Sequence, residues 1–199
     1  MKATGNDPRA VSRGLGRGGI LVVTAIMALG LASPAAADTF PGNYDLRLAD
    51  DAIQTYCLTS TFFLEEHKVV PEYAMYWLDQ TTQMSDMSQG TCVNSTDAKW
   101  YDANLPAGIR GERVCIVVGD IPSVCDRSNI TLDFAELDIG SLDWEDRRKT
   151  ACHELGHSVG LNHHSSGAEG CMLSGEVPSA DVQWRRYTTH DVGHINAAY

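Results

Sequence analysis

The sequence has no apolar run long enough to cross a membrane. The longest, Ile20 to Leu31, contains 12 residues, whereas a transmembrane helix needs about 20. Basic residues are also scarce, since 15 Lys and Arg stand against 26 Asp and Glu in 199 residues. Because phosphates repel an acidic surface, this balance argues against a nucleic-acid partner. Internal repeats and low-complexity linkers are missing from residues 38–199, so we expect one domain there.

The N-terminus has the composition of a secretion signal. A run of three alanines at residues 35–37 suits signal cleavage. We therefore expect a signal peptide over residues 1–37 and a secreted, extracellular protein with no stable membrane association, a retained anchor being the alternative. Cleavage would leave 11 basic and 25 acidic residues and a charge of −14, which fits a soluble secreted protein. Four basic residues precede the apolar run: Lys2, Arg9, Arg13 and Arg17.

All six cysteines lie after residue 37. An even number of cysteines in an exported chain indicates disulfides. Six cysteines allow 15 pairings, and the sequence does not choose among them. We prefer the sequential set, because its second bond closes a short loop between two strand-like runs and its third staples a helix to the turn that follows. These pairs are Cys57–Cys92, Cys115–Cys125 and Cys152–Cys171.

Hydrophobic spacing predicts several elements before residue 140. Aromatic residues at helical spacing predict a helix over residues 71–85, with Pro71 in its first turn. Residues 114–118 and 130–137 are expected to form strands, the second with clear alternation, joined by residues 119–129.

Two further helices are expected after residue 140. The first begins near Asp143, a candidate cap, and carries the basic residues 147–149 on a solvated face. The second follows Thr188, whose spacing to Asp191 resembles a capping box. Its apolar stripe consists of Val192, Ile195 and Tyr199.

Residues 153–163 read HELGHSVGLNH and contain three histidines and one glutamate. Positions i and i+4 of a helix project from the same face, so His153 and His157 can bind one ion. A continued helix would carry His163 about 9 Å beyond His157 and point it aside. Gly160 stands where the helix must end for His163 to return, since glycine adopts the left-handed conformation without steric cost.

This arrangement predicts chemistry as well as metal binding. Three histidine ligands leave a fourth position for water, as in catalytic rather than structural zinc sites. We expect one zinc ion, which makes the water acidic and polarises a peptide carbonyl. Glu154 would act as the general base that takes the water's proton and passes it to the departing amine. A non-catalytic binding module is the alternative, and the presence of Glu154 favours the enzyme; a purely structural protein leaves the spacing unexplained.

Other histidines compete for these roles. His164 directly follows His163, and neighbouring side chains diverge, so the spacing favours His163 as the third ligand. His190 and His194 also lie at i and i+4, but no glycine break or third ligand follows them. We interpret this pair as a solvated or partly packed face. His67 is expected at the surface.

Residues 153–163 match the HExxHxxGxxH signature of the metzincin zinc endopeptidases. Residues 189–199 look like the final helix of matrixin catalytic domains, so the chain resembles matrixin-like metzincins most closely. The resemblance is dense over residues 144–199 and thin before them. In that family a methionine turn forms an apolar floor under the metal, and Met172 matches it by position.

The resemblance implies an α+β fold. It has a twisted, mixed five-strand sheet, mostly parallel, with an active-site helix and a small C-terminal subdomain that ends in a helix. A polypeptide substrate would lie extended along an edge strand, beside a pocket walled by residues 174–188. We expect a monomer with a single catalytic domain over residues 38–199. The chain departs from matrixins because no cysteine-bearing pro-segment fits between Asp38 and the domain. It departs from astacin-like relatives because Ser174 stands where they have a metal-binding tyrosine.

Overall fold

A six-stranded sheet is the framework of the protein. The computed structural model describes residues 40, 47–165 and 169–199, and the expected signal peptide lies outside them. The strand order is β1-β6-β4-β2-β3, and β5 pairs with β6. The strands are β1 (Leu48–Ala49), β2 (Ile53–Leu58), β3 (Ser85–Ser88), β4 (Ala98–Asp102), β5 (Gly111–Val118) and β6 (Val124–Leu132).

The sheet is mixed and mostly parallel, as expected. Strand β6 runs parallel to β1 and β4, and β2 runs parallel to β3 and β4, whereas β5 runs antiparallel to β6. The expected number of five strands is wrong, because β1 adds a sixth. This strand has two residues, which pair with Val124 and Cys125, and so short a segment leaves no alternation in the sequence.

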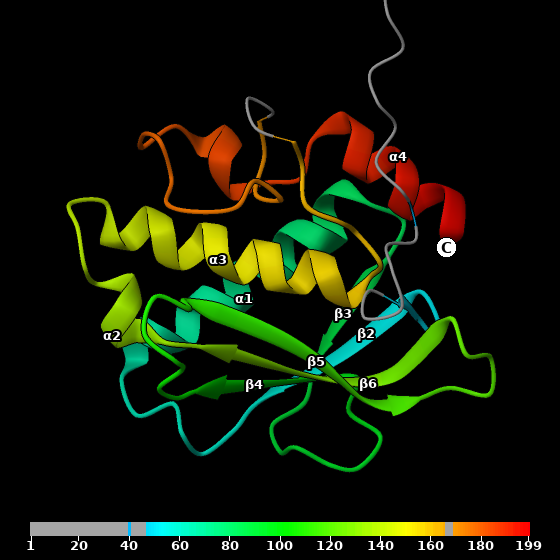
Figure 1. Ribbon diagram of the computed structural model, residues 1–199. Helices are drawn as coiled ribbons and strands as arrows, with labels where there is room; N and C mark the ends of the chain where they lie inside the picture. The colour runs from blue at the N-terminus through cyan, green and yellow to red at the C-terminus, as the bar shows by residue number, and fades with distance from the viewer. Residues whose placement is uncertain (1–39, 41–46, 166–168) are drawn as a thin grey trace, which may run out of the picture. The chain divides into compact units, whose positions relative to one another are not determined.

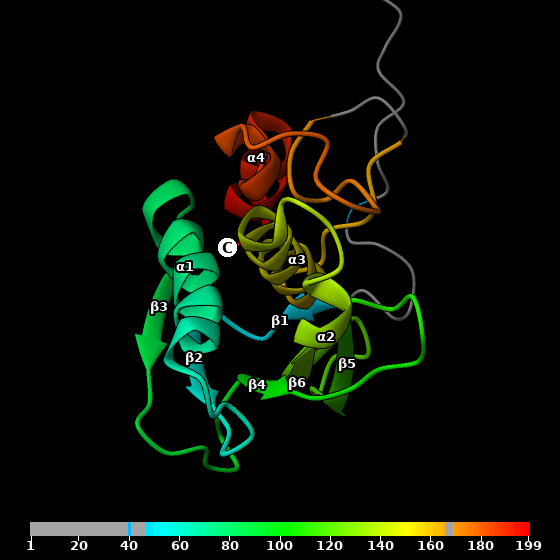
Figure 2. The same cartoon turned by 90° about the vertical axis from the view of Figure 1, so that its left-hand side faces the viewer.

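In the part of the chain that the structure describes, four α-helices accompany the sheet: α1 (Glu65–Thr81), α2 (Phe134–Leu137), α3 (Asp143–Ser158) and α4 (Thr189–Ala198), with a 3₁₀ turn, η1, at Val182–Arg185. Helices α1 and α3 contact each other over one face of the sheet, and α4 lies beyond α3 (Figures 1 and 2). Apolar side chains from both layers fill the space between sheet and helices. The largest fully buried ones include Trp100, Ile130, Leu132, Met75, Leu78 and Leu155.

The predicted helix over residues 71–85 is shifted. Helix α1 begins at Glu65 and ends at Thr81, so Pro71 lies in its second turn rather than its first. Two acidic residues, Glu65 and Glu66, occupy the first turn, where the helix dipole favours negative charge. Leu64 precedes them without a side-chain cap. The true start therefore carries no capping signal that the sequence could reveal.

The predicted strand over residues 130–137 is only partly correct. Strand β6 ends at Leu132, and α2 follows. The Asp133 carboxylate accepts hydrogen bonds from the backbone N–H groups of Ala135 and Glu136 at 3.0 and 3.2 Å, so it caps a short helix. The predicted connection over residues 119–129 is also too long, because β6 already begins at Val124.

The last two helices start differently from each other. Helix α3 is preceded by Leu142, which makes no side-chain cap, so Asp143 is its first residue and not its cap. At α4 the predicted capping box is confirmed. Asp191 Oδ2 accepts from the Thr188 N–H at 2.8 Å, and Thr188 Oγ1 accepts from the Asp191 N–H at 3.2 Å. Ile195 of the predicted stripe is fully buried.

Three disulfides join the cysteines in the expected sequential order: Cys57–Cys92, Cys115–Cys125 and Cys152–Cys171. The second links the antiparallel neighbours β5 and β6, and the third links α3 to the segment that precedes η1. Three disulfides fit an extracellular protein. None of the helices in the described part of the chain has the length and apolarity needed to cross a bilayer.

Candidate metal centre

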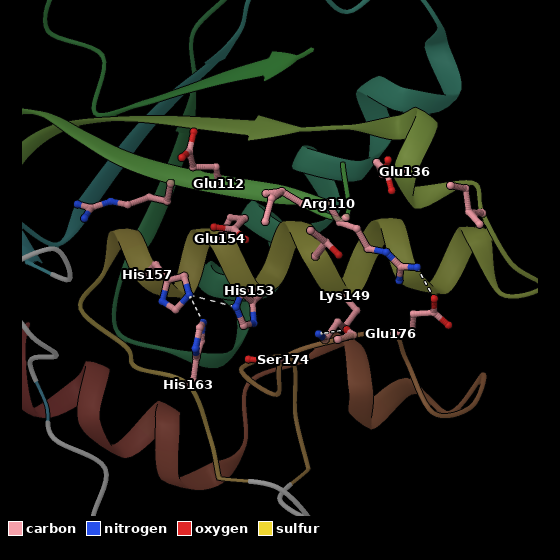
Figure 3. A pocket seen from close by; sticks show the side chains of 17 residues that line it. Arg110, Glu112, Glu136, Lys149, His153, Glu154, His157, His163, Ser174 and Glu176 are labelled. Atoms are coloured by element: carbon pink, nitrogen blue, oxygen red, sulfur yellow. Dashed lines mark hydrogen bonds and ion pairs between the residues drawn. The ribbon is translucent and has the colours of Figure 1, made fainter. Parts of the chain in front are cut away.

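Three histidine side chains converge beside the C-terminal half of α3 (Figure 3). The Nε2 atom of His157 lies 3.1 Å from that of His153 and 3.0 Å from that of His163. Three nitrogens bound tetrahedrally to zinc at 2.0–2.1 Å would lie about 3.3 Å apart. The two separations from His157 are close to this value, and all three ligand atoms lie within 4.8 Å of one another. Within residues 40, 47–165 and 169–199, no other set of three histidine, cysteine or acidic side chains converges in this way.

The end of α3 explains how His163 reaches the other two. The helix ends at Ser158, and Gly160 has φ = 94°. The Leu161 N–H donates to the Gly156 carbonyl at 2.9 Å, and the Gly160 N–H donates to the His157 carbonyl at 3.4 Å. These are the two hydrogen bonds of a Schellman motif with glycine in the left-handed position. The chain therefore turns back sharply where the glycine predicted that it would.

Backbone carbonyls orient two of the three imidazoles. His157 Nδ1 lies 2.9 Å from the Leu161 carbonyl, and His153 Nδ1 lies 2.8 Å from the Cys171 carbonyl. Because a carbonyl only accepts, each Nδ1 carries the proton and each Nε2 offers a lone pair to the centre. Beside the third histidine, Asn162 Oδ1 accepts a hydrogen bond from the His163 backbone N–H at 2.8 Å. The sequence had suggested no role for Asn162.

Met172 packs against α3 and is fully buried. A Cβ added at Gly156 would overlap the Met172 sulfur, so this glycine allows the methionine to pack closely against the helix. The Cys152–Cys171 disulfide ties the same segment to α3. Met172 is thus held against α3, and its role as a methionine turn beneath a bound metal stays a prediction.

The carboxyl group of Glu154 is held between α3 and β5. Its side chain lines the cleft, and the residue is 7% exposed. A Cβ added at Gly111, the first residue of β5, would lie 2.9 Å from Glu154 Oε1, so only glycine lets the strand approach this closely. Burial raises the pKa of Glu154 to about 8, against the lowering effect of Lys149. Gly111 gave no signal in the sequence, because its partner is 43 residues away.

The triad and Glu154 line a cleft of about 700 Å³. Its walls come from the start of β5, from α3 and from residues 174–176 (Figure 3). The cleft therefore lies along the edge strand of the sheet, with the three Nε2 atoms at one side of it. Such a groove can admit an extended chain beside the metal-binding side chains.

Lys149 corrects the expectation of a solvated basic face. It is 3% exposed, and its Nζ donates to the Gly175 carbonyl at 2.6 Å. Burial lowers the pKa of Lys149 to about 8. One turn earlier, Asp146 Oδ1 accepts from the Val177 N–H at 2.6 Å. These two side chains attach the cleft wall formed by residues 174–176 to α3.

The neighbouring arginines of the same run are also engaged. The Arg147 guanidinium donates to both carboxylate oxygens of Asp138, at 2.6 and 2.7 Å. The Arg148 guanidinium lies 3.9 Å from the Trp144 ring centroid and 4.3 Å from that of Tyr73. Each residue of the basic run therefore contacts a group outside α3: Lys149 contacts Gly175, Arg147 contacts Asp138 and Arg148 contacts Tyr73.

The competing histidines lie elsewhere. His164 Nε2 is 2.7 Å from Asp191 Oδ1, so its imidazole pairs with the cap of α4. His67 is buried rather than exposed, which corrects the expectation of a surface position. Its Nδ1 lies 2.9 Å from Asp102 Oδ2, and its ring stacks on Phe134 at 3.7 Å.

The structure thus combines a mixed, mostly parallel sheet, three convergent histidines and a cleft. No protein-family model matches the chain, and no curated protein sequence matches it.

Proposed function

We propose that the protein is a secreted, zinc-dependent endopeptidase of the metzincin type, closest to the matrixins. One observation carries this proposal: three imidazole Nε2 atoms converge beside a buried carboxyl group in a cleft along an edge strand. A structural metal site would need no such cleft and no adjacent acid.

His153, His157 and His163 would hold the ion. Burial lowers the pKa of His157 to about 4 and that of His153 well below the usual histidine value, so both rings are neutral at pH 7 and able to bind a cation. Neutral imidazoles suit zinc. When bound, zinc supplies a lowered pKa for water and polarisation of the substrate carbonyl.

Glu154 acts as the general base. It accepts a proton from the attacking water and then donates that proton to the amine nitrogen as the C–N bond breaks. Burial between α3 and Gly111 raises the pKa of this carboxyl in the metal-free protein to about 8. A bound cation beside it would lower that pKa toward the neutral pH at which a general base works best. Such a transfer contributes about 10²–10⁴-fold to a rate.

The geometry of β5 supports a polypeptide substrate. Strand β5 pairs with β6 along one side, and its first residues, Gly111 to Arg113, line the cleft beside Glu154. An extended peptide can add to such an edge through main-chain hydrogen bonds. Ser174, Gly175 and Glu176 form the facing wall, so the peptide would run between this wall and the strand.

Cleavage of a mixed peptide library by the purified protein tests this function, with Glu154→Gln as the matched variant. We expect one tightly bound zinc per chain in both proteins and a cleavage rate that is about 10²–10⁴-fold lower in the variant. A chelator should abolish cleavage by the wild type, and added zinc should restore it. Bound zinc without cleavage by either protein would instead support the binding module. A protein that takes up no zinc would refute both.

A further inference from the structure

Helix α4 carries a second pair of histidines with the same geometry as the pair on α3. The Nε2 atoms of His190 and His194 lie 3.0 Å apart, with ring centroids separated by 4.4 Å and planes inclined at 80°. For His153 and His157 the values are 3.1 Å, 4.5 Å and 82°. The exposed pair on α4 thus presents two nitrogens in the arrangement that the α3 pair presents to the metal centre.

The surroundings of the α4 pair favour a bound cation. His190 is exposed and His194 is partly exposed, so an ion can reach both from solvent. The His194 ring stacks on Phe40, with centroids 4.8 Å apart and planes inclined at 24°, and this contact holds the ring in place. The formal charge of the chain is −11, which raises the local concentration of cations.

We propose that His190 and His194 form a second, surface metal site for a late first-row divalent ion such as Cu²⁺, Ni²⁺ or Zn²⁺. Imidazole is a preferred ligand of these ions, and water would complete the coordination. This site extends the expectation of a single zinc ion and is independent of the activity proposed for the first site. With two ligands instead of three, it should bind more weakly than the triad.

A hydrogen bond between the two rings could also produce a separation of 3.0 Å, so the test must measure metal binding itself. The purified protein is first loaded with one equivalent of zinc, which the tighter triad takes up, and is then titrated with Ni²⁺ by calorimetry. The matched variants are His194→Ala, and His194→Ala combined with Ala197→His. The double variant keeps two histidines on exposed positions of α4 but places them two turns apart, about 10 Å along the axis.

The wild type should take up one more Ni²⁺ than either variant. Loss of a ligand should weaken this uptake at least about tenfold, since loss of a residue that only hydrogen-bonds to a metal ligand already costs about 10–100-fold. Exchange at the first site is common to all three proteins, so the difference reports the α4 pair. Circular dichroism checks that each variant is folded. Equal uptake by the wild type and His194→Ala, or full uptake by the double variant, would overturn the proposal.

Discussion

Two five-residue stretches, HELGH at residues 153–157 and HDVGH at residues 190–194, place similar histidine pairs on α3 and α4. Their ring geometries agree within 2° and 0.1 Å. The i, i+4 spacing alone therefore suffices to aim two nitrogens at one point. The two stretches differ in the contacts of their acidic residues and in whether a third histidine joins the pair.

The acidic residues show this difference most clearly. Glu154 lines the cleft beside the converging imidazoles. Asp191, at the equivalent position of α4, accepts from the Thr188 N–H and pairs with His164, so its carboxylate is already used. The α3 stretch also gains His163 through the turn at Gly160. A catalytic role is therefore proposed for α3 alone, and only ion binding for α4.

Removal of one imidazole from each pair should give the largest difference between the two stretches, measured as the zinc affinity of the triad. His157 has the central Nε2 of the triad, so His157→Ala should lower the zinc affinity of the tight site at least about 100-fold. His190→Ala should leave that affinity within about twofold, because His190 lies outside the triad. Competition with a chromophoric chelator measures both. A similar loss in both variants would show that the two pairs are not distinct sites.

The disulfides test whether the segment after α3 orients a ligand. Removal of Cys152–Cys171 or of Cys115–Cys125 by double alanine substitution should lower the free energy of unfolding by about 3 kcal/mol each, since the bonded cysteines are 19 and 10 residues apart. Only the first removal should also weaken zinc binding, because the Cys171 carbonyl orients His153. Urea unfolding with metal removed, followed by a zinc titration, separates the two effects. Equal zinc affinity in both variants would contradict the orienting role.

Burial of the α3 pair should make the metal-free protein sensitive to acid. The pKa of His157 is about 4 when folded and about 6.5 when unfolded. Between these values the unfolded state binds more protons, so stability falls as pH decreases from about 6.5 to 4, by on the order of 3 kcal/mol. Above pH 6.5 this residue contributes no dependence. Urea unfolding across this range measures the slope, and an unchanged slope in His157→Ala would contradict the assignment.

Substitution of alanine for the glycine at the fourth position of each stretch should change the stability of the protein in opposite directions. A Cβ at Gly156 would overlap Met172 and lie 3.2 Å from the Tyr187 ring, so Gly156→Ala should lower stability by about 1–2 kcal/mol after its gain in helix propensity. A Cβ at Gly193 would meet nothing within 4 Å, so Gly193→Ala should raise stability by about 0.5–1 kcal/mol. Thermal unfolding compares them. An increase in the stability of Gly156→Ala would contradict the close packing of Met172 against α3.

Local patterns predicted the parts of the site that depend on neighbouring residues. The ligand spacing, the break at Gly160 and the capping box at Thr188 each involve positions within one or two turns. The sequential disulfide set, which the pattern alone left open, is also the set that the structure contains.

The features that escaped prediction depend on distant partners. The sequence predicts a solvated Lys149, but this side chain is buried and bonds to the Gly175 carbonyl. It predicts an exposed His67, but Asp102 and Phe134 contact that ring in the interior. Gly111 approaches Glu154 across the sheet edge. The sequence between residues 130 and 137 continues a strand pattern that the Asp133 cap interrupts. Hydrophobic periodicity cannot report contacts of this kind.

Anomalous diffraction at the zinc absorption edge, from a crystal of the zinc-loaded protein, tests the central claim most directly. We predict the strongest peak at the point where the Nε2 atoms of His153, His157 and His163 converge, with any peak between His190 and His194 weaker. Full occupancy at α4 with no peak at the triad would contradict the account.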